Sequence, residues 1–129
     1  MKLAKRLPEN ASQHTTAGPY SPVLEITCSK LIVISGQASL DLKGNVIGTT
    51  IEEQTEATLN NCLDQLNRAD CSFEDVFKVN VFLTDLDQWG RFNAIYEKYM
   101  PQPYPVRTAV GAALLSSFLV EIEMWAAKK

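Results

Sequence analysis

The sequence has few of the residues that hold metals or cofactors. Its 129 residues include one histidine, His14, and three cysteines, Cys28, Cys62 and Cys71, which lack the spacing of metal ligands. His14 could complete a zinc site with them only if distant segments converged, so we interpret the cysteines as reduced thiols that mostly pack. A Walker loop, a dinucleotide fingerprint and a zinc deaminase signature are also absent from the sequence. We therefore predict no metal and no cofactor.

Basic residues and long apolar runs are also scarce. Twelve Lys and Arg are scattered among 15 Asp and Glu, for a formal charge of −3, which leaves no electrostatic footprint for nucleic acid. No apolar run approaches the length of a membrane span. The polar stretch 9–16 follows the basic start directly, without the hydrophobic run of a signal peptide. We expect a cytoplasmic protein whose partners include neither nucleic acid nor membrane.

Apolar residues, by contrast, suffice for one core. A content of 46% hydrophobic and 21% charged residues suits a single globular domain over residues 1–129. Residues 31–34 (Leu-Ile-Val-Ile) are apolar without alternation, which predicts a strand that is covered on both faces and lies deep in a sheet. Residues 41–45 have turn chemistry and lead out of that strand.

A helix and a strand follow in the middle of the chain. Thr50 can cap the helix, Glu53 completes a capping box, and an apolar stripe at helical spacing covers residues 55–66. Residues 76–83 then alternate, which predicts a strand with one fully buried face. That face would consist of Phe77, Val79, Val81 and Leu83.

A second helical segment opens at Asp87 and ends near Pro101, before two further strands at 106–115 and 118–126. Large apolar side chains recur along the helix every three or four residues: Trp89, Phe92, Ile95, Tyr96 and Tyr99. The order of elements and the right-handed crossover rule predict an α+β fold, a mixed sheet with both helices packed on one face. The other face would stay partly apolar, and its expected cover is another copy of the chain.

Arg107 is the first candidate for chemistry. It lies at the start of an apolar strand, where an unpaired charge is costly, so something must satisfy it. One interpretation is an ion pair with Glu121 or Glu123. The other is a ligand, because a guanidinium is a bidentate partner for a substrate carboxylate. The sequence leaves these two alternatives evenly balanced.

The last strand offers carboxylates. Glu121 and Glu123 alternate with apolar residues, so both point to one face. A solvated strand face is the plain interpretation, and we prefer it for Glu123. Partial burial would favour the protonated form of Glu121 and suit it to shuttle protons.

Three further positions each have a plain and a functional interpretation. Ser35 and Gly36 end the first strand, either as a bulge or as a place where a ligand approaches the backbone. Tyr20, in a stiff Gly-Pro-Tyr-Ser-Pro loop, is either packing or a pocket wall. Asn93 on the second helix either faces solvent or reaches a site.

Taken in order, these segments resemble the reactive intermediate deaminase family, also known as YjgF-type or L-PSP proteins. The resemblance spans nearly the whole chain, and the order and spacing of its pieces make it specific. The pieces are residues 18–21 (Gly-Pro-Tyr-Ser), 34–37 (Ile-Ser-Gly-Gln), 54–55 (Gln-Thr), 76–85 (Val-Phe-Lys-Val-Asn-Val-Phe-Leu-Thr-Asp), 92–96 (Phe-Asn-Ala-Ile-Tyr), 105–110 (Pro-Val-Arg-Thr-Ala-Val) and 120–123 (Val-Glu-Ile-Glu).

The resemblance implies a chorismate-mutase-like α+β fold, assembled as a homotrimer with clefts at the subunit interfaces. It implies hydrolytic deamination of enamine and imine intermediates, such as 2-aminoacrylate, to 2-keto acids and ammonia without metal or cofactor. Carried over by motif, Arg107 would clamp the substrate carboxylate and Glu121 would position water and move protons. The pocket would be shaped by Tyr20, Ser35, Gly36 and Asn93.

The chain also departs from the family pattern. Ala109 stands where many relatives carry a cysteine, and residues 114–119 are more apolar than the usual Leu-Pro turn, which puts the substrate range in doubt. The main alternative is a non-catalytic trimer that binds a keto acid or amino acid through Arg107 and has a regulatory role. An RNA-cleaving role is weaker, because the chain is acidic and has neither a basic stripe nor a pair of histidines.

Overall fold

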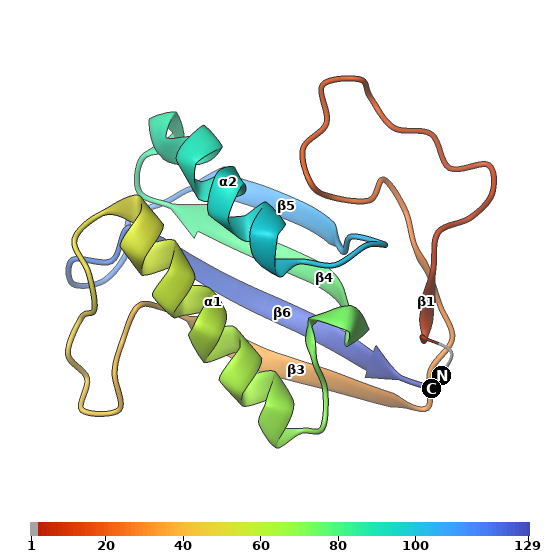
Figure 1. Cartoon of the computed structure of the whole chain (residues 1–129), viewed down its shortest axis with the longest axis horizontal. Coiled ribbons are helices and arrows are strands. Elements are labelled where there is room, and N and C mark those ends of the chain that lie inside the picture. Colours follow the sequence, from red (N-terminus) through yellow and green to blue (C-terminus); the bar gives the residue numbers. More distant parts are fainter. Residues whose placement is uncertain (1–2) are drawn as a thin grey trace.

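The computed structural model describes residues 3–129 and centres on a four-stranded mixed sheet (Figure 1). The strands β3 (Lys30–Gln37), β6 (Val120–Lys128), β4 (Val76–Leu83) and β5 (Val106–Gly111) lie side by side in that order. β6 runs antiparallel to both of its neighbours, whereas β4 and β5 are parallel. The helix between β4 and β5 provides the crossover that parallel strands need.

Two helices cover one face of this sheet, as the sequence predicts (Figure 1). α1 (Ile51–Arg68) begins with the predicted capping box, in which Thr50 accepts a hydrogen bond from the Glu53 amide and Glu53 accepts one from the Thr50 amide. α2 (Trp89–Tyr99) follows a short 3₁₀ turn, Leu86–Gln88, and packs beside α1. The α+β fold class is therefore confirmed.

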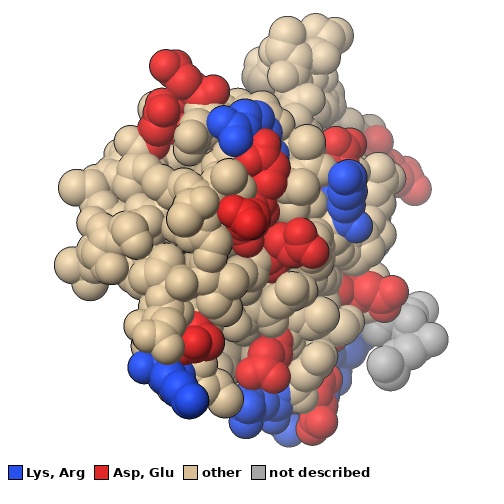
Figure 2. Space-filling view, turned by 60° about the vertical axis from the view of Figure 1, so that its left-hand side comes forward, with Lys and Arg blue, Asp and Glu red and all other residues tan. Residues whose placement is uncertain are grey.

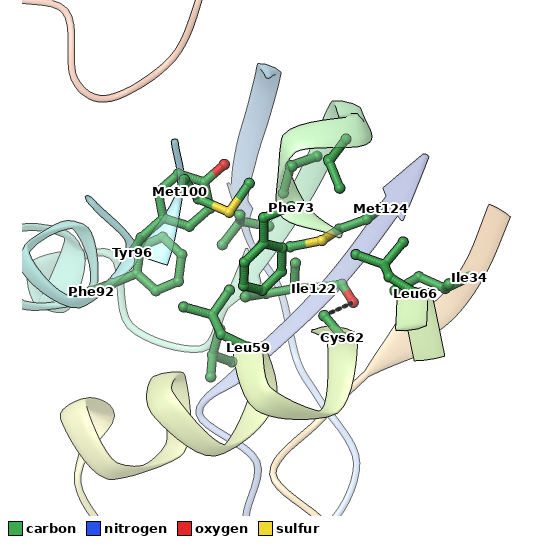
Figure 3. Close-up of a cluster of buried hydrophobic side chains, with 14 of the residues drawn as sticks. Ile34, Leu59, Cys62, Leu66, Phe73, Phe92, Tyr96, Met100, Ile122 and Met124 are labelled. Carbon is green, nitrogen blue, oxygen red and sulfur yellow. Dashed lines mark hydrogen bonds between the residues drawn. The ribbon is translucent and has the colours of Figure 1, made fainter. Parts of the chain in front are cut away.

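The core lies between the helices and the covered face of the sheet (Figure 3). Leu59 and Cys62 of α1, Phe92 of α2, and Ile122 and Met124 of β6 have no exposed surface. Burial raises the pKa of the Cys62 thiol to about 12, so this cysteine packs as a neutral side chain. The interpretation of Cys62 as a packing residue is consistent with this position.

The predicted position of the first strand was wrong in one respect. β3 lies at the edge of the sheet, not deep within it, and only Ile32 and Ile34 face the helices. Leu31 and Val33 point to the other face and are 59% and 60% exposed. The apolar run arises because both faces of the strand are apolar, although this chain covers only one of them.

Two other strand predictions need correction. A bulge between Val76 and Lys78 in the pairing of β4 with β6 leaves Phe77 half-buried, in edge contact with Trp125, so it does not join the buried face. β5 ends at Gly111 instead of residue 115, because its partner strand β4 ends at Leu83, to whose carbonyl the Ala112 amide makes the last ladder hydrogen bond. The last strand, predicted at 118–126, is β6.

An N-terminal arm precedes the sheet. Its two-residue strands β1 (Lys5–Arg6) and β2 (Glu25–Ile26) pair with each other, and the intervening loop reaches the start of β5 (Figure 1). The buried Lys5 ammonium donates to the carbonyls of Val76 and Pro103 at 2.7 and 2.8 Å, which fixes the arm to the sheet. Within residues 3–129, no helix is both long and apolar enough to cross a membrane.

Candidate functional site

The Arg107 guanidinium lies among three aromatic rings on the helix-covered side of β5. Its central carbon is 4.7 Å from the ring centre of Tyr96, 4.8 Å from that of Trp89 and 5.3 Å from that of Tyr20. α2 supplies Trp89 and Tyr96, while the N-terminal arm supplies Tyr20. Cation–π attraction from these rings stabilises the charge in a partly buried position.

Asn93 completes this group, because Nη1 of Arg107 donates to its side-chain oxygen at 2.9 Å. We call these five residues the arginine cluster: Tyr20, Trp89, Asn93, Tyr96 and Arg107. Nη2 of Arg107 and the Tyr96 hydroxyl are buried and lie close enough to influence each other's pKa, but neither makes a hydrogen bond of good geometry with the described residues. Buried donors of this kind are rare in folded proteins, so each needs an explanation.

An ion pair does not provide that explanation. Within residues 3–129, the ion pairs of arginine are Arg6–Glu25, Arg68–Asp64 and Arg91–Glu52, and none includes Arg107. Arg107 therefore forms no ion pair with Glu121 or Glu123 within one chain. Burial lowers the pKa of Arg107 somewhat from its ordinary 12.5, but a guanidinium stays charged near neutral pH.

The loop at residues 18–22 holds Tyr20 against the guanidinium. The Tyr20 amide donates to the Gly18 carbonyl at 2.8 Å, and the Ser21 amide donates to the Pro105 carbonyl, just before β5, at 3.1 Å. A Cβ at Gly18 would lie 3.3 Å from Nη2 of Arg107, which is closer than ordinary contact. Any other residue at position 18 would therefore push the guanidinium aside by a few tenths of an ångström.

Two hollows flank the arginine cluster. A cleft of 420 Å³ lies beside Tyr20 and is mainly polar, with the exposed His14 and Thr108 and the half-buried Lys78 in its wall. A smaller cavity of 280 Å³ is lined by Leu86, Trp89 and Ala109. The lone histidine thus lies near the candidate site, although no nucleophile motif accompanies it.

The remaining predicted residues form a second group, the carboxylate cluster of Ser35, Gly36 and Glu121. The pairing of β3 with β6 shifts between Ile34 and Gln37, so Ser35 and Gly36 form the bulge that was one of the two expectations. A Cβ at Gly36 would overlap Oε2 of Glu121, so the glycine makes room for the carboxylate. Ser35 is exposed and Glu121 is half-buried.

Glu121 and Glu123 share one face of β6, as alternation predicts. The residues that alternate with them, Val120, Ile122 and Met124, are buried and point to the helices. Glu123 accepts a hydrogen bond from Asn80 Nδ2 at 2.9 Å. This contact ties Glu123 to the neighbouring strand.

The two clusters lie on opposite faces of the sheet. Arg107 and Met124 both pair with the core residue Val79, so all three point to the helices. Glu121 pairs with Phe82 and points to the open face, two strands away from β5. A single chain therefore brings Arg107 to Tyr20 and Asn93 but does not bring it to Glu121.

Trp89 and Tyr96 are members of the arginine cluster that the sequence did not assign to the site. Their helical spacing predicts a core face of α2, and Tyr96 is indeed fully buried. The available signal was the coincidence of an aromatic-rich helix face with an arginine on the following strand, since a βαβ crossover packs the two together.

Comparison with known proteins gives concordant results. A profile of the family described as Endoribonuclease L-PSP matches residues 10–128. The "Putative regulator AldR" of Lactococcus lactis is 40% identical over 114 residues, 87% of this chain and 89% of that protein. The human 2-iminobutanoate/2-iminopropanoate deaminase is 32% identical over 123 residues, 94% and 88% of the two chains.

Solved structures share the fold as well. A Thermotoga maritima protein, described as a "putative endoribonuclease", superposes with a TM-score of 0.74 at 34% identity and covers 100% of this chain and 99% of its own. The fold and site define a small α+β protein with two helices on one face of a mixed sheet and an arginine among aromatic rings. Given the match over residues 10–128, the chain belongs to the Endoribonuclease L-PSP family, the YjgF or Rid proteins.

Proposed function

We propose that this protein hydrolyses reactive enamine and imine intermediates of the 2-aminoacrylate type to 2-keto acids and ammonia. The observation that carries the proposal is the partly buried Arg107, which has one unpartnered nitrogen and no carboxylate beside it among residues 3–129. A substrate carboxylate would supply the missing charge and accept the free N–H groups. The deaminase name of the human relative supports this chemistry.

The proposed site is shared between copies of the chain. Arg107 and Glu121 lie on opposite faces of one sheet, so the Glu121 that serves a given Arg107 would come from a second copy. The open face has the apolar surface that such an assembly would bury, including Leu31, Val33 and Trp125. A closed homotrimer would place one site at each of its interfaces.

In the reaction, water adds to the imine carbon, the carbon–nitrogen bond breaks, and the nitrogen leaves as ammonia. Arg107 would hold the substrate carboxylate while Tyr20 and Asn93 fix the guanidinium. Glu121 would take one proton from the attacking water and pass it to the imine nitrogen, and would then pass the proton of the resulting carbinolamine hydroxyl to the departing nitrogen, so that imine and water give keto acid and ammonia with no net proton consumed. An enamine would first become the imine by transfer of a proton from its nitrogen to its carbon. Ser35 and Gly36 would shape the other side of the pocket. An imine has a low intrinsic barrier to hydrolysis, so this positioning can suffice without an activated nucleophile.

The test is ammonia release from imines that an amino-acid oxidase generates in the assay. Arg107→Ala should lower kcat/KM roughly hundredfold, because it removes a charge-assisted contact and the positioning that depends on it. Arg91→Ala is the matched control. It removes the same charge from α2, the helix that packs against Arg107, but Arg91 lies on the surface and pairs with Glu52. Equal activity of both variants would refute the role of Arg107.

A regulatory, non-catalytic binder is the second candidate. The name of the Lactococcus lactis relative favours it, and the same arginine cluster could hold a keto acid or amino acid without turning it over. Glu121→Gln separates the two functions. If the protein is an enzyme, the Glu121→Gln variant should lose imine hydrolysis and keep ligand binding. If it is a binder, neither wild type nor the variant should accelerate imine hydrolysis.

RNA cleavage, which the family description names, has less support. The sequence contains a single histidine, so one chain cannot provide the two-histidine pair of a general acid and base. Figure 2 shows Lys and Arg interspersed with Asp and Glu on the face in view, without a continuous basic stripe. A phosphate backbone is bound through such a stripe.

A further inference from the structure

The small cavity beside the arginine cluster has an apolar lining. Leu86, Trp89 and Ala109 line its 280 Å³, and none of them is titratable. The Trp89 ring belongs to both places, since it lines the cavity and lies 4.8 Å from the guanidinium carbon. Ala109 follows Arg107 by two residues on the same face of β5. Arg107 itself lines the larger cleft and not this cavity, so the shared Trp89 ring is what connects the cavity to a molecule held by the guanidinium.

Of two small residues of β5, Ala109 leaves the space open and Gly111 lets Leu86 close one end of it. Ala109 contributes only a methyl group to the wall. At Gly111 the missing side chain allows Leu86 to approach, because an added Cβ would lie 3.2 Å from Leu86 Cγ. Leu86 closes that end while it remains 54% exposed, so an apolar group in the cavity would cover surface that now faces water.

The size and polarity of the hollows indicate what each one suits. Pockets for drug-sized ligands begin at about 300 Å³, so a cavity of 280 Å³ fits part of a small ligand. The larger cleft on the Tyr20 side contains His14, Lys78 and Thr108 and offers polar contacts instead. An apolar substituent of a carboxylate held by Arg107 would thus be driven toward Trp89 and Ala109.

We propose that this cavity receives the side chain of the substrate, and that the protein prefers 2-imino acids with large apolar side chains to those with a methyl group. The inference rests on the proposed deaminase function and names its substrate class. Leucine-derived imines are the representative case. Ala109 and Leu86 are the residues that set the preference, and Trp89 provides the wall that side chain and guanidinium share.

Binding of the product keto acids tests the preference without relying on turnover. In titration calorimetry, wild type should bind 4-methyl-2-oxopentanoate at least roughly tenfold more tightly than pyruvate, because several additional carbons enter an apolar pocket. Ala109→Leu should fill the cavity and reduce the ratio of the two affinities, 4-methyl-2-oxopentanoate over pyruvate, to near one. Ala113→Leu makes the same change at an exposed loop position and should keep the wild-type ratio.

Leu86→Asn provides a second variant in case Ala109→Leu does not fold, because the Leu86 side chain is exposed enough to be replaced without disturbing the core. It should also lower the ratio, since an amide would line the cavity. If pyruvate binds wild type as tightly as 4-methyl-2-oxopentanoate, the preference is refuted while the deaminase proposal stands. If neither keto acid binds wild type, the carboxylate-binding role of Arg107 fails and both proposals are overturned.

Discussion

The two faces of the sheet differ in what covers them. On the helix side, Val79, Ile122 and Met124 have no exposed surface, whereas Leu31 and Val33 on the other side are more than half exposed. The open face is mixed, because the apolar side chains of Leu31, Val33 and Trp125 share it with Glu121 and Glu123, and the two helices of the chain cover only the other face. The covered face therefore accounts for folding of one chain, and the open face is the surface that the proposed association between chains would bury.

The candidate chemistry is divided between the same two faces. The arginine cluster lies on the covered side, where α2 supplies three of its five members. The carboxylate cluster lies on the open side, at a bulge of an edge strand. Under the proposed function, one chain positions the binding residue Arg107 by itself, whereas the proton-transfer residue Glu121 reaches a site only after association.

The largest change in stability should come from a substitution on the covered face. Leu59→Ala removes a fully buried side chain and should lower the free energy of unfolding by about 2–5 kcal/mol, through lost apolar burial and a cavity. Urea denaturation measures this change. Leu42→Ala, at a fully exposed loop position, should change stability by less than about 0.5 kcal/mol. Similar losses for both variants would contradict the assignment of the core.

The open face should respond differently. Val33→Asp places a charge on the surface that we assign to association and should weaken that association by about 2 kcal/mol, roughly a 30-fold rise in the dissociation constant. Sedimentation at several protein concentrations measures it. Leu42→Asp adds the same charge away from the sheet and should leave the mass unchanged. An unchanged mass for Val33→Asp would remove this face from the interface.

A smaller effect concerns the arm that brings Tyr20 to Arg107. Lys5→Met leaves the carbonyls of Val76 and Pro103 without their donor and should destabilise the fold by about 1–3 kcal/mol. Burial lowers the pKa of Lys5 from 10.5 to about 8, although Asp75 and Glu74 oppose the shift.

This pKa fixes the sign of the pH dependence. Between pH 8 and 10.5, Lys5 is protonated to a greater extent in the unfolded chain than in the folded one. The free energy of unfolding of wild type therefore rises with pH over this range. The stability difference between wild type and Lys5→Met should therefore be smallest below pH 8 and widen toward pH 10.5. Denaturation curves across this range would contradict the account if the difference narrowed.

Local signals in the sequence predicted much of the fold. The Thr50 and Glu53 pair marks the start of α1 because a capping box depends on residues that are neighbours in sequence. The run at 31–34 misled because a sequence records which side chains are apolar but not what covers them. The bulge at Phe77 escaped prediction because it depends on pairing with a strand 47 to 50 residues later, as in Lys78 with Trp125 and Val76 with Ala126.

The candidate site was predictable residue by residue but not as an arrangement. Alternation places Glu121 opposite its apolar neighbours within β6, and the residues around Arg107 mark a charge that needs a partner. Neither pattern tells which face of the sheet each residue takes relative to the other. That relation follows from strand order and register, which place Arg107 with Val79 and Glu121 with Phe82.

Complementation between two inactive variants tests the shared site most directly. Arg107→Ala and Glu121→Gln would be refolded together in equal amounts, and imine hydrolysis would be compared with that of each variant refolded alone. If each site combines Arg107 of one copy with Glu121 of another, random mixing should restore about a quarter of the wild-type activity, because one interface in four receives both intact residues. Activity no higher than that of the separate variants, in mixed assemblies verified by mass, would contradict a site shared between chains.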